Sequence, residues 1–552
     1  MDSFSEPGRS LLAGGKYIRA WTWIWCVLAV LHVTQSIWTS AGRAYPGDLG
    51  DGRFNQLILE HGYQSLRGVT RWDSPSQFYP ATGTLAYSDT HAGTLVIYAG
   101  ARFLGISREE AWQVWFVIVV ALNAWAALRL FRAFEVHPWL RGPVVFASAG
   151  SAIFVWVACT HMQMLPVFPA LFASEQLLRW RSDRRRSRII ATAGWLGWQF
   201  AASPYLGFFA VVVLGLVGLA YGALGGRGGK SDSPSSEFHG RIHWLPAAFI
   251  FVVGAGLAAA TILVYSSAVR TGVSRPMSDV LIAAPQWSSW LQTPPTREFP
   301  SPLRVPGNSN PTEHCWFVGW IASALLITAI FSGWRRTSAP ARRWSLALAL
   351  VTVITPVLFT AWTATGDSVW IWIARHVEIL RAFRASGRVA VPLQFAAIGA
   401  AALLLSQWLQ LAKSRIARIG VILLACAMAL ENFSPRQRFT LTATARARTQ
   451  AMIAAWKAAG DRPVLVYAPV PPPAGENASF FHLDAWSAAL QLRRATVNGY
   501  TGGAPASYAA FASEPTPANA GALLRAIGLS ENDISFVGRP INWTTQMNGR
   551  PK

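Results

Sequence analysis

The chain has 552 residues, of which 52% are hydrophobic and only 13% are charged. Soluble domains usually carry about 25% charged residues, so this composition argues against a soluble enzyme and predicts a polytopic membrane protein. The net charge of +22 does not indicate nucleic-acid binding, because the arginines fall mostly in short linkers between apolar runs and form no basic stripe with interleaved aromatics.

Apolar runs of about the length that a bilayer requires predict eleven transmembrane helices. In chain order they are 18–40, 111–131, 142–160, 162–179, 188–203, 205–224, 244–266, 315–333, 344–363, 389–411 and 416–432. The run 93–105 is shorter and contains Arg102, so we interpret it as an amphipathic or re-entrant helix on the membrane surface.

The distribution of basic residues predicts the orientation. If the N-terminus is inside and 93–105 does not span, every inner linker carries Arg or Lys, as the positive-inside rule requires. These linkers are 132–141, 180–187, 225–243, 334–343 and 412–415. We therefore expect a multi-pass protein of the cytoplasmic (inner) membrane, with its N-terminus inside and its C-terminus outside.

This orientation places all the long segments on the outer side. They are the first outer loop 41–110, the loops 267–314 and 364–388, and the tail 433–552. The tail combines a strand-like run at 463–467 with helical stretches at 445–459 and 518–527. We predict two domains, a transmembrane domain over 1–432 and a small soluble α/β domain over 433–552.

The first outer loop begins with two carboxylates in a glycine-rich turn, Gly47-Asp48-Leu49-Gly50-Asp51. Asp51 or Asp48 is a candidate general base, which would take a proton from an acceptor hydroxyl. The alternative is that Asp48 caps the helix expected over 53–67 and Asp51 only shapes the turn. Both interpretations remain open on sequence alone.

Further along the same loop, Asp89 and His91 are candidate substrate-binding residues. Asp89 is equally able to cap the helix over 93–105. A divalent metal such as Mg²⁺ or Mn²⁺, if one is used, would be held by Asp51 and Asp89. No further residues with zinc-ligand spacing accompany them.

The two later outer loops contribute charged candidates. Glu313 and His314 end the tryptophan- and proline-rich loop 267–314, which is expected to lie on the membrane or to gate a lipid cleft. Three outer-side arginines run against the positive-inside trend, and guanidinium groups bind phosphate oxygens in bidentate fashion. These arginines, Arg381, Arg384 and Arg388, are candidate ligands of a phosphate headgroup; the alternative is pairing with Asp51, Asp89 or Glu378. Glu431 is expected to pair with one such arginine.

Taken together, these segments resemble the GT-C class of integral membrane glycosyltransferases. The runs Gly47-Asp48-Leu49-Gly50-Asp51, Phe78-Tyr79-Pro80, Tyr87-Ser88-Asp89 and Phe383-Arg384-Ala385-Ser386-Gly387-Arg388 are similar to motifs of bacterial YfhO-like and related GT-C-like membrane proteins. The resemblance covers the architecture of the whole chain but only short stretches of its sequence.

The resemblance implies transfer of a sugar from a polyprenyl-phosphate donor to a glycan, lipid or protein acceptor, with inversion at the anomeric carbon. It implies that Asp51, with Asp48 second, acts as the base, and that Arg384 or Arg388 stabilises the leaving phosphate. Metal dependence differs among members of the class, and this chain lacks an adjacent Asp-x-Asp pair.

Two other functions remain open. A flippase or transporter of lipid-linked sugars would be expected to carry charges in the middle of its spans and to consist of repeated halves. The predicted spans are largely uncharged and no repeat is visible, which counts against this function. A non-catalytic GT-C-like scaffold is equally consistent with the pattern, since fold does not determine function.

Overall fold

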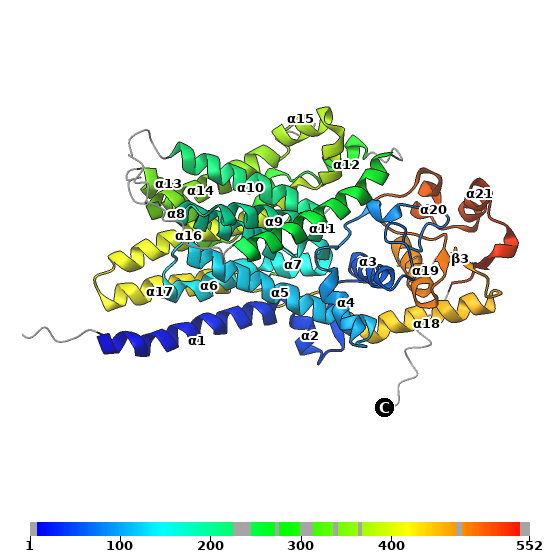
Figure 1. The fold of residues 1–552 in the computed structure, drawn as a ribbon, viewed down its shortest axis with the longest axis horizontal. Helices are drawn as coiled ribbons and strands as arrows, with labels where there is room; N and C mark the ends of the chain where they lie inside the picture. Colours follow the sequence, from blue (N-terminus) through cyan, green and yellow to red (C-terminus); the bar gives the residue numbers. More distant parts are fainter. Residues whose placement is uncertain are drawn as a thin grey trace, which may run out of the picture.

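The computed structural model describes residues 8–224, 244–270, 275–297, 313–334, 340–362, 367–470 and 477–540. The helices form an elongated bundle, and a smaller unit built from the C-terminal residues lies at one end (Figure 1). The predicted inner segments 225–243 and 335–339 lie outside the described residues, as do parts of the loops 267–314 and 364–388.

The helices of the bundle and of its outer loops follow the chain in order. They are α1 (Gly8–Val33), α2 (Gln35–Thr39), α3 (Asp51–Leu66), α4 (Leu95–Phe103), α5 (Arg108–Ala133), α6 (Pro138–Ala149), α7 (Ala152–Thr160), α8 (Phe168–Asp183), α9 (Arg186–Ala202), α10 (Pro204–Ala223), α11 (Trp244–Arg270), α12 (Met277–Ala283), α13 (Trp320–Trp334), α14 (Pro340–Phe359), α15 (Val369–His376), α16 (Ala390–Leu411) and α17 (Arg415–Glu431).

Six helical segments among the described residues are long and apolar enough to cross a membrane, which makes the chain a membrane protein. They are Arg108–Ala133, Pro138–Thr160, Pro204–Ala223, Trp244–Ser266, Pro340–Phe359 and Ser386–Leu411. Each coincides with a predicted span. The other five predicted spans fall on α1, α8, α9, α13 and α17, which are not among the six, so the count of eleven is not confirmed.

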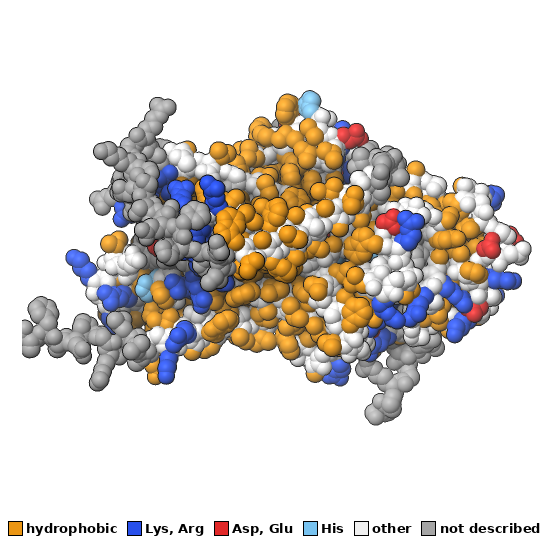
Figure 2. All heavy atoms as spheres, in the orientation of Figure 1, with side chains coloured by type: hydrophobic (Ala, Val, Ile, Leu, Met, Phe, Trp, Pro, Cys, Tyr) orange, Lys and Arg blue, Asp and Glu red, His pale blue; other side chains and the backbone are white. Residues whose placement is uncertain are grey.

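The surface of the bundle agrees with this assignment. Figure 2 shows a broad apolar surface along the bundle and Lys and Arg side chains at the end away from the C-terminal unit. Helix α4 has nine residues and would extend only about 14 Å. It is therefore too short to span a bilayer, as the sequence predicts for 93–105.

The C-terminal unit contains a parallel sheet. Its three strands, β3 (Val464–Tyr467), β4 (Ala495–Thr496) and β5 (Ile534–Val537), lie in the order β4-β3-β5. Helices α18 (Thr442–Ala458) and α19 (Ala478–Leu492) pack on this sheet, and α20 (Ala509–Ser513) and α21 (Pro517–Ile527) follow. The strand predicted at 463–467 and the helices predicted at 445–459 and 518–527 correspond to β3, α18 and α21.

The first outer loop and the C-terminal unit are joined by backbone hydrogen bonds. Strand β1 (Ala44–Pro46) pairs antiparallel with β2 (Phe439–Leu441). Phe78 and Tyr79 donate their backbone N–H groups to the carbonyl oxygens of Asn498 and Thr496, at 3.2 and 3.0 Å. The Phe78 ring is buried and contacts the ring of Tyr508 edge-on. The Phe78-Tyr79-Pro80 motif thus attaches the loop to the C-terminal sheet.

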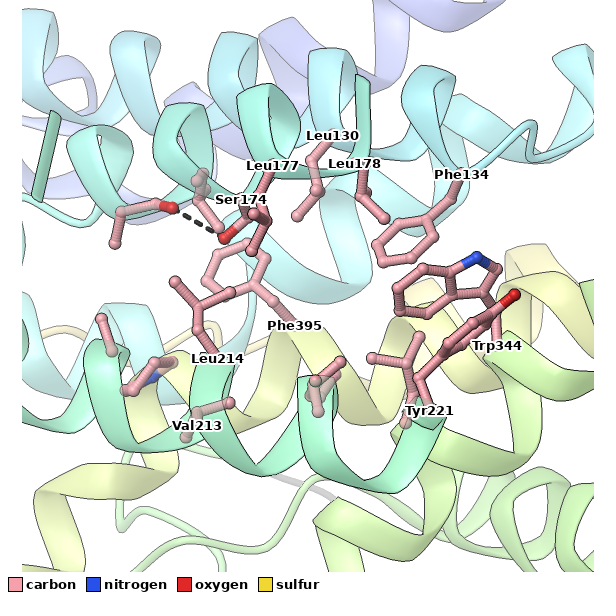
Figure 3. Close-up of a pocket in the computed structure, with 18 of the residues that line it drawn as sticks. Leu130, Phe134, Ser174, Leu177, Leu178, Val213, Leu214, Tyr221, Trp344 and Phe395 are labelled. Atoms are coloured by element: carbon pink, nitrogen blue, oxygen red, sulfur yellow. Dashed lines mark hydrogen bonds between the residues drawn. The ribbon is translucent and has the colours of Figure 1, made fainter. Parts of the chain in front are cut away.

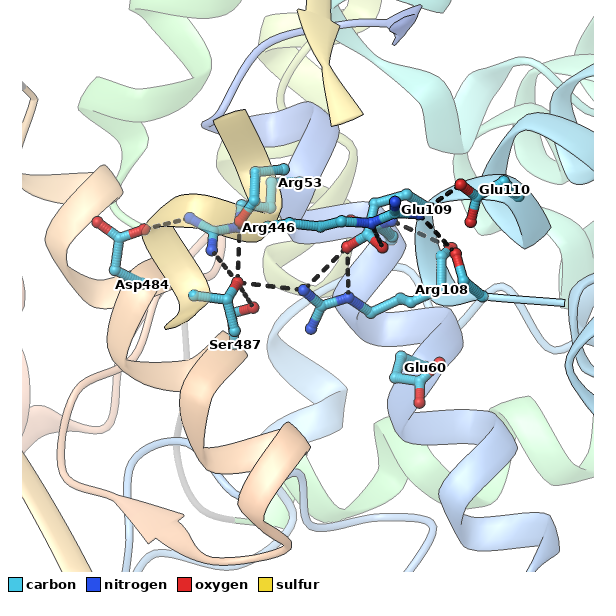
Figure 4. A network of polar contacts seen from close by, with 12 residues as sticks. Arg53, Glu60, Arg108, Glu109, Glu110, Arg446, Asp484 and Ser487 are labelled. Carbon is cyan, nitrogen blue, oxygen red and sulfur yellow. Dashed lines mark hydrogen bonds and ion pairs between the residues drawn. The ribbon is translucent and has the colours of Figure 1, made fainter. Parts of the chain in front are cut away.

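Buried charges hold the same two parts together (Figure 4). Arg53 of α3 and Arg448 of α18 both pair with Asp484 of α19, and both side chains of the Arg53–Asp484 pair are fully buried. Nearby, Arg446 donates to Glu109 of α5 at 3.0 Å. A buried ion pair keeps its geometry because separating the charges in a low-dielectric interior is costly. The network therefore fixes the C-terminal unit against α3 and α5.

Candidate functional site

The glycine-rich turn places the start of α3 close against the bundle. Gly47 has φ +103°, and a Cβ there would lie 2.1 Å from the Met162 methyl group; a Cβ on Gly52 would lie 2.9 Å from it. The Asp48 carboxylate accepts hydrogen bonds from the N–H groups of Gly50 and Gly52, at 3.0 and 3.2 Å. These glycines allow the close approach, and Asp48 satisfies N–H groups at the helix start that lack partners within the helix.

Asp51, the first residue of α3, presents its carboxylate beside two groups from distant parts of the chain. Its Oδ1 accepts a hydrogen bond from the Tyr500 hydroxyl at 2.7 Å, and its Oδ2 lies 4.0 Å from His161 Nδ1. The Asp51 side chain is 39% exposed, whereas His161 is buried. An accessible carboxylate oriented by a tyrosine hydroxyl and close to an imidazole has the geometry of a general base.

His161 connects Asp51 to a buried ion pair. Its Nε2 lies 3.2 Å from Glu313 Oε1, and its Nδ1 accepts from Arg388 Nη2 at 3.4 Å if the ring proton is placed on Nε2. The Arg388 guanidinium grips the Glu313 carboxylate in bidentate fashion and lies 4.7 Å from the centre of the Tyr205 ring. The first outer loop is thereby linked to the loop ending at Glu313 and to the segment around Arg388.

The carboxyl groups of this cluster respond differently to burial. Burial alone would raise the pKa of Glu313, but the Arg388 charge and the His161 contact hold that pKa well below its usual range. Burial raises the pKa of Asp89 to about 7, with a partly opposing effect from Arg388. Glu313 is therefore ionised at neutral pH, while Asp89 exchanges its proton there.

Asp89 makes the stability of the protein depend on pH in a testable way. Because its folded-state pKa of about 7 exceeds the unfolded value near 3.9, its contribution to stability is complete below about pH 4 and is lost as the pH rises to 7. Asp89→Asn removes this loss, so the variant should gain stability over wild type by up to about 1.4 kcal/mol per pH unit in this range.

Thermal unfolding of the detergent-purified protein at pH 5, 6, 7 and 8 measures this difference. Asp73→Asn, at a half-buried position of the same loop, is the control, and its unfolding temperature should differ from that of the wild type by the same amount at every pH. If the unfolding temperatures of the wild type and Asp89→Asn change with pH in parallel, Asp89 is not a buried carboxyl group that titrates in this range.

Two arginines share one carboxylate beside the cluster. Arg384 Nη1 lies 3.1 Å and Arg275 Nη1 3.5 Å from Asp279 Oδ2. The loop of the C-terminal unit covers Arg275, since a Cβ on Gly502 would lie 2.6 Å from Arg275 Nη2. Burial raises the pKa of Tyr500 above its usual range, Asp51 raises it further, and the nearby Arg384 charge opposes the rise. The arrangement leaves an excess of positive charge next to the Asp51–Tyr500 pair.

Several candidates from the sequence lie away from this cluster. His91 is buried and its Nε2 lies 2.6 Å from Asn55 Oδ1. Arg381 donates to the carbonyl oxygen of Ala374 at 3.0 Å. His314 follows Glu313 of the cluster in the chain and is buried, and burial lowers its pKa. The contacts of His91 and Arg381 are with Asn55 and with a backbone carbonyl.

Two other expectations have specific outcomes. Glu431 pairs with Arg297, at 3.3 Å, instead of with an arginine of 381–388, and it also accepts from the Ile321 N–H at the start of α13. The N-cap residue of α3 is Gly50, and Asp48, two positions earlier, accepts from the N–H groups of Gly50 and Gly52, which is close to its alternative interpretation as a helix cap. Burial raises the pKa of the Asp48 carboxyl, against the opposing effect of the Gly52 N–H.

His161, Tyr500, Arg275 and Tyr205 are not marked as candidates by the sequence pattern. His161 is a histidine at the junction of two predicted spans on the outer side, and Tyr500 lies in the glycine-containing run 498–503. Polar residues at span junctions and aromatic residues in glycine-rich loops were the available signals. Neither signal shows which partner the residue meets.

The described residues do not provide a ligand set for a metal. No group of three or more His, Cys, Asp or Glu side chains converges in the part of the chain that the structure describes. The Asp51 carboxylate accepts a hydrogen bond from the Tyr500 hydroxyl, and Asp89 is influenced by the charge of Arg388. We assign no step to a metal.

The solved structures that resemble this chain include an arabinofuranosyltransferase and an oligosaccharyltransferase. The arabinofuranosyltransferase AftD from Mycobacteria has a TM-score of 0.43 and 14% identity, over 81% of this chain and 29% of that chain. The Archaeoglobus fulgidus oligosaccharyltransferase, in complex with zinc and sulfate, has a TM-score of 0.42 and 11% identity, over 87% of this chain and 62% of that one. The chain thus spans less than two thirds of either protein, and a likeness at these scores establishes no shared activity.

Comparison with protein families gives a more definite result. No curated protein matches the chain. A family model described as "Domain of unknown function (DUF6311)" matches residues 19–431, which is most of the chain and includes the Asp51, His161, Glu313 and Arg388 cluster. The match does not confirm the resemblance to YfhO-like proteins. The chain belongs to the DUF6311 family.

Proposed function

We propose that this protein is a membrane glycosyltransferase that moves a sugar from a polyprenyl-phosphate donor to a hydroxyl group of a glycan, lipid or protein acceptor. The proposed place of reaction is the outer face of the cytoplasmic membrane. The observation that carries the proposal is the accessible Asp51 carboxylate, oriented by Tyr500. The charge of Arg384 acts on Tyr500, and Arg384 shares the Asp279 carboxylate with Arg275.

The proposed reaction uses these groups as follows. Asp51 accepts the proton of the acceptor hydroxyl while that oxygen forms a bond to the anomeric carbon of the donor sugar. The bond between the anomeric carbon and the phosphate oxygen breaks, and its electron pair leaves with the polyprenyl phosphate. Arg384 and Arg275 neutralise the charge that develops on this phosphate. A single displacement of this kind inverts the anomeric configuration.

Glu313 and Arg388 have a positioning role in this proposal. The Arg388–Glu313 ion pair is buried, whereas the Arg384 side chain is 34% exposed. Arg388 is therefore less available to a phosphate than Arg384. The ion pair contacts His161, whose Nδ1 lies 4.0 Å from the Asp51 carboxylate, and so positions the imidazole that borders the base. Of the arginines considered in the sequence, Arg384 is therefore the one that we assign to the donor.

Arg384→Gln tests the assignment of the donor phosphate. Loss of one charge-assisted contact of about 1.5–3 kcal/mol should lower kcat/KM for the donor by roughly 10- to 100-fold. The assay is sugar transfer by the protein in nanodiscs with a panel of polyprenyl-phosphate sugars. Arg375→Gln, from the same outer region, is the matched control and should retain wild-type activity.

The same assay separates the proposal from its alternatives. Sugar release or transfer by the wild type supports an enzyme. Movement of the intact lipid-linked sugar between leaflets without release would instead identify a flippase. Lipid binding with neither release nor movement, for every donor in the panel, would identify a scaffold.

A further inference from the structure

A cavity lies within the bundle, away from the Asp51 cluster. It has a volume of about 360 Å³ and is lined mainly by apolar side chains of α5, α8, α10, α14 and α16. Figure 3 shows Leu130, Leu214 and Phe395 facing it from three of these helices. Its size falls in the range of small-molecule sites, and its apolar lining suits a hydrocarbon chain.

One end of the cavity is aromatic and basic. Phe134, Tyr221 and Trp344 lie together there (Figure 3), and Arg181 also lines the cavity. The guanidinium carbon of Arg181 lies 3.8 Å and that of Arg343 3.9 Å from the centre of the Tyr221 ring. Cation–π contacts of this kind hold guanidinium groups at the edge of an apolar site.

Three nearby arginines form ion pairs with carboxylates, whereas Arg181 and Arg343 do not. Arg129 and Arg179 pair with Glu175, and Arg188 pairs with Asp183. Among the described residues, neither Arg181 nor Arg343 has a carboxylate within ion-pair distance. Arg343 donates instead to the carbonyl oxygen of Tyr221 at 2.8 Å. Arg184 also lines the cavity and lies over the Trp180 ring. The mouth of the cavity therefore carries an excess of positive charge, from Arg181, Arg184 and the adjacent Arg343, that an anionic ligand would balance.

The basic end lies at the opposite end of the spans from the proposed reaction site. Tyr221 is near the C-terminal end of α10, whereas Tyr205, which contacts Arg388, is at its N-terminal end. Arg181 belongs to the linker region that the sequence places inside. A donor whose phosphate lies at Arg384 cannot place the same phosphate at Arg181, so the two sites are distinct.

We propose that this cavity binds an anionic membrane phospholipid of the inner leaflet, independently of the donor. An acyl chain occupies the apolar cavity, and the headgroup phosphate lies between Arg181 and Arg343. The charge complementarity at the mouth selects an anionic headgroup over a zwitterionic one, and the apolar lining selects a lipid over a free phosphate.

The test is lipid titration of the delipidated full-length protein, followed by native mass spectrometry. Dioleoyl phosphatidylglycerol should bind roughly 10- to 30-fold tighter than dioleoyl phosphatidylcholine, since each arginine near the surface favours an anionic lipid. Arg181→Gln/Arg343→Gln should remove this preference. Lys413→Gln/Arg415→Gln lowers the charge by the same amount at exposed positions of the predicted inner face and should keep it.

A second variant tests the cavity itself. Gly218 lines the cavity, and a Cβ at this position would meet no atom within 4 Å, so Gly218→Phe fills the space without a backbone clash. It should weaken binding of both lipids by at least about 10-fold. Equal affinity of the wild type for the two lipids would overturn the proposal, as would equal losses in the two double variants. Competition by glycerol phosphate as effective as that by the lipid would show a phosphate site only.

Discussion

Asp51→Asn is expected to lower the rate of sugar transfer by roughly 10²- to 10⁴-fold, the usual contribution of a general base. The substitution keeps the shape of the side chain and an oxygen that accepts from Tyr500, but an amide does not accept the proton of the acceptor hydroxyl. Binding of the polyprenyl-phosphate donor should remain, because the arginine pair that we assign to the phosphate is unchanged. The loss should therefore appear in kcat.

The measurement is transfer by the protein in nanodiscs with the donor that the wild type uses, together with a separate donor-binding assay. Asp73→Asn is the matched control, because Asp73 is a carboxylate of the same loop that pairs with exposed Arg71. Wild-type kcat in Asp51→Asn would exclude Asp51 as the base. Tyr500→Phe should give a smaller loss, since it removes only the hydrogen bond that orients the carboxylate.

The second large effect is expected for Asp484→Asn. Asp484 is fully buried between Arg53 and Arg448, and removing its charge deprives the fully buried Arg53 guanidinium of its carboxylate partner and takes one carboxylate contact from Arg448. Breaking a buried pair in this way typically costs about 3–5 kcal/mol. Because Arg53 belongs to the helix that begins with Asp51, the variant should loosen the C-terminal unit from the first outer loop.

Thermal unfolding and limited proteolysis of the detergent-purified protein measure this effect. Asp461→Asn breaks the exposed pair with Arg494 and should cost less than about 1 kcal/mol. The triple variant Arg53→Met/Arg448→Met/Asp484→Leu removes the charges of these three residues and should be more stable than Asp484→Asn. If Asp484→Asn and the Asp461→Asn control unfold at the same temperature, the buried ion pairs of Asp484 do not hold the C-terminal unit to the first outer loop.

Part of the architecture was predictable from local pattern. The six segments that are long and apolar enough to cross a membrane all coincide with predicted spans, because a run of apolar residues signals its own burial in lipid. The strand at 464–467 and the helices α18 and α21 also followed from local periodicity. The five remaining predicted spans fall on helices outside the six. Four of these helices, α8, α9, α13 and α17, have only 15 to 17 residues, and an apolar run does not by itself reveal where its helix begins and ends.

The candidate site was predictable only in its outline. Carboxylates and outer-side arginines mark Asp51, Glu313, Arg384 and Arg388 as polar residues in need of partners, and all four lie in or beside one cluster. The partners themselves were not predictable. Tyr500 and Asp51 are separated by 449 positions in the chain, and no local pattern relates them.

By itself, the sequence determined that this is a multi-span membrane protein with its polar motifs in a few long segments, because hydrophobicity and charge act on each segment independently of the others. Only the tertiary structure decided that Arg388 grips Glu313, that Asp48 accepts from N–H groups at the start of a helix while Asp51 stays accessible, and that a loop of the C-terminal unit brings Tyr500 to Asp51. These outcomes depend on which charged side chains are buried together, and the cost of burying a charge without a partner is a property of the assembled fold.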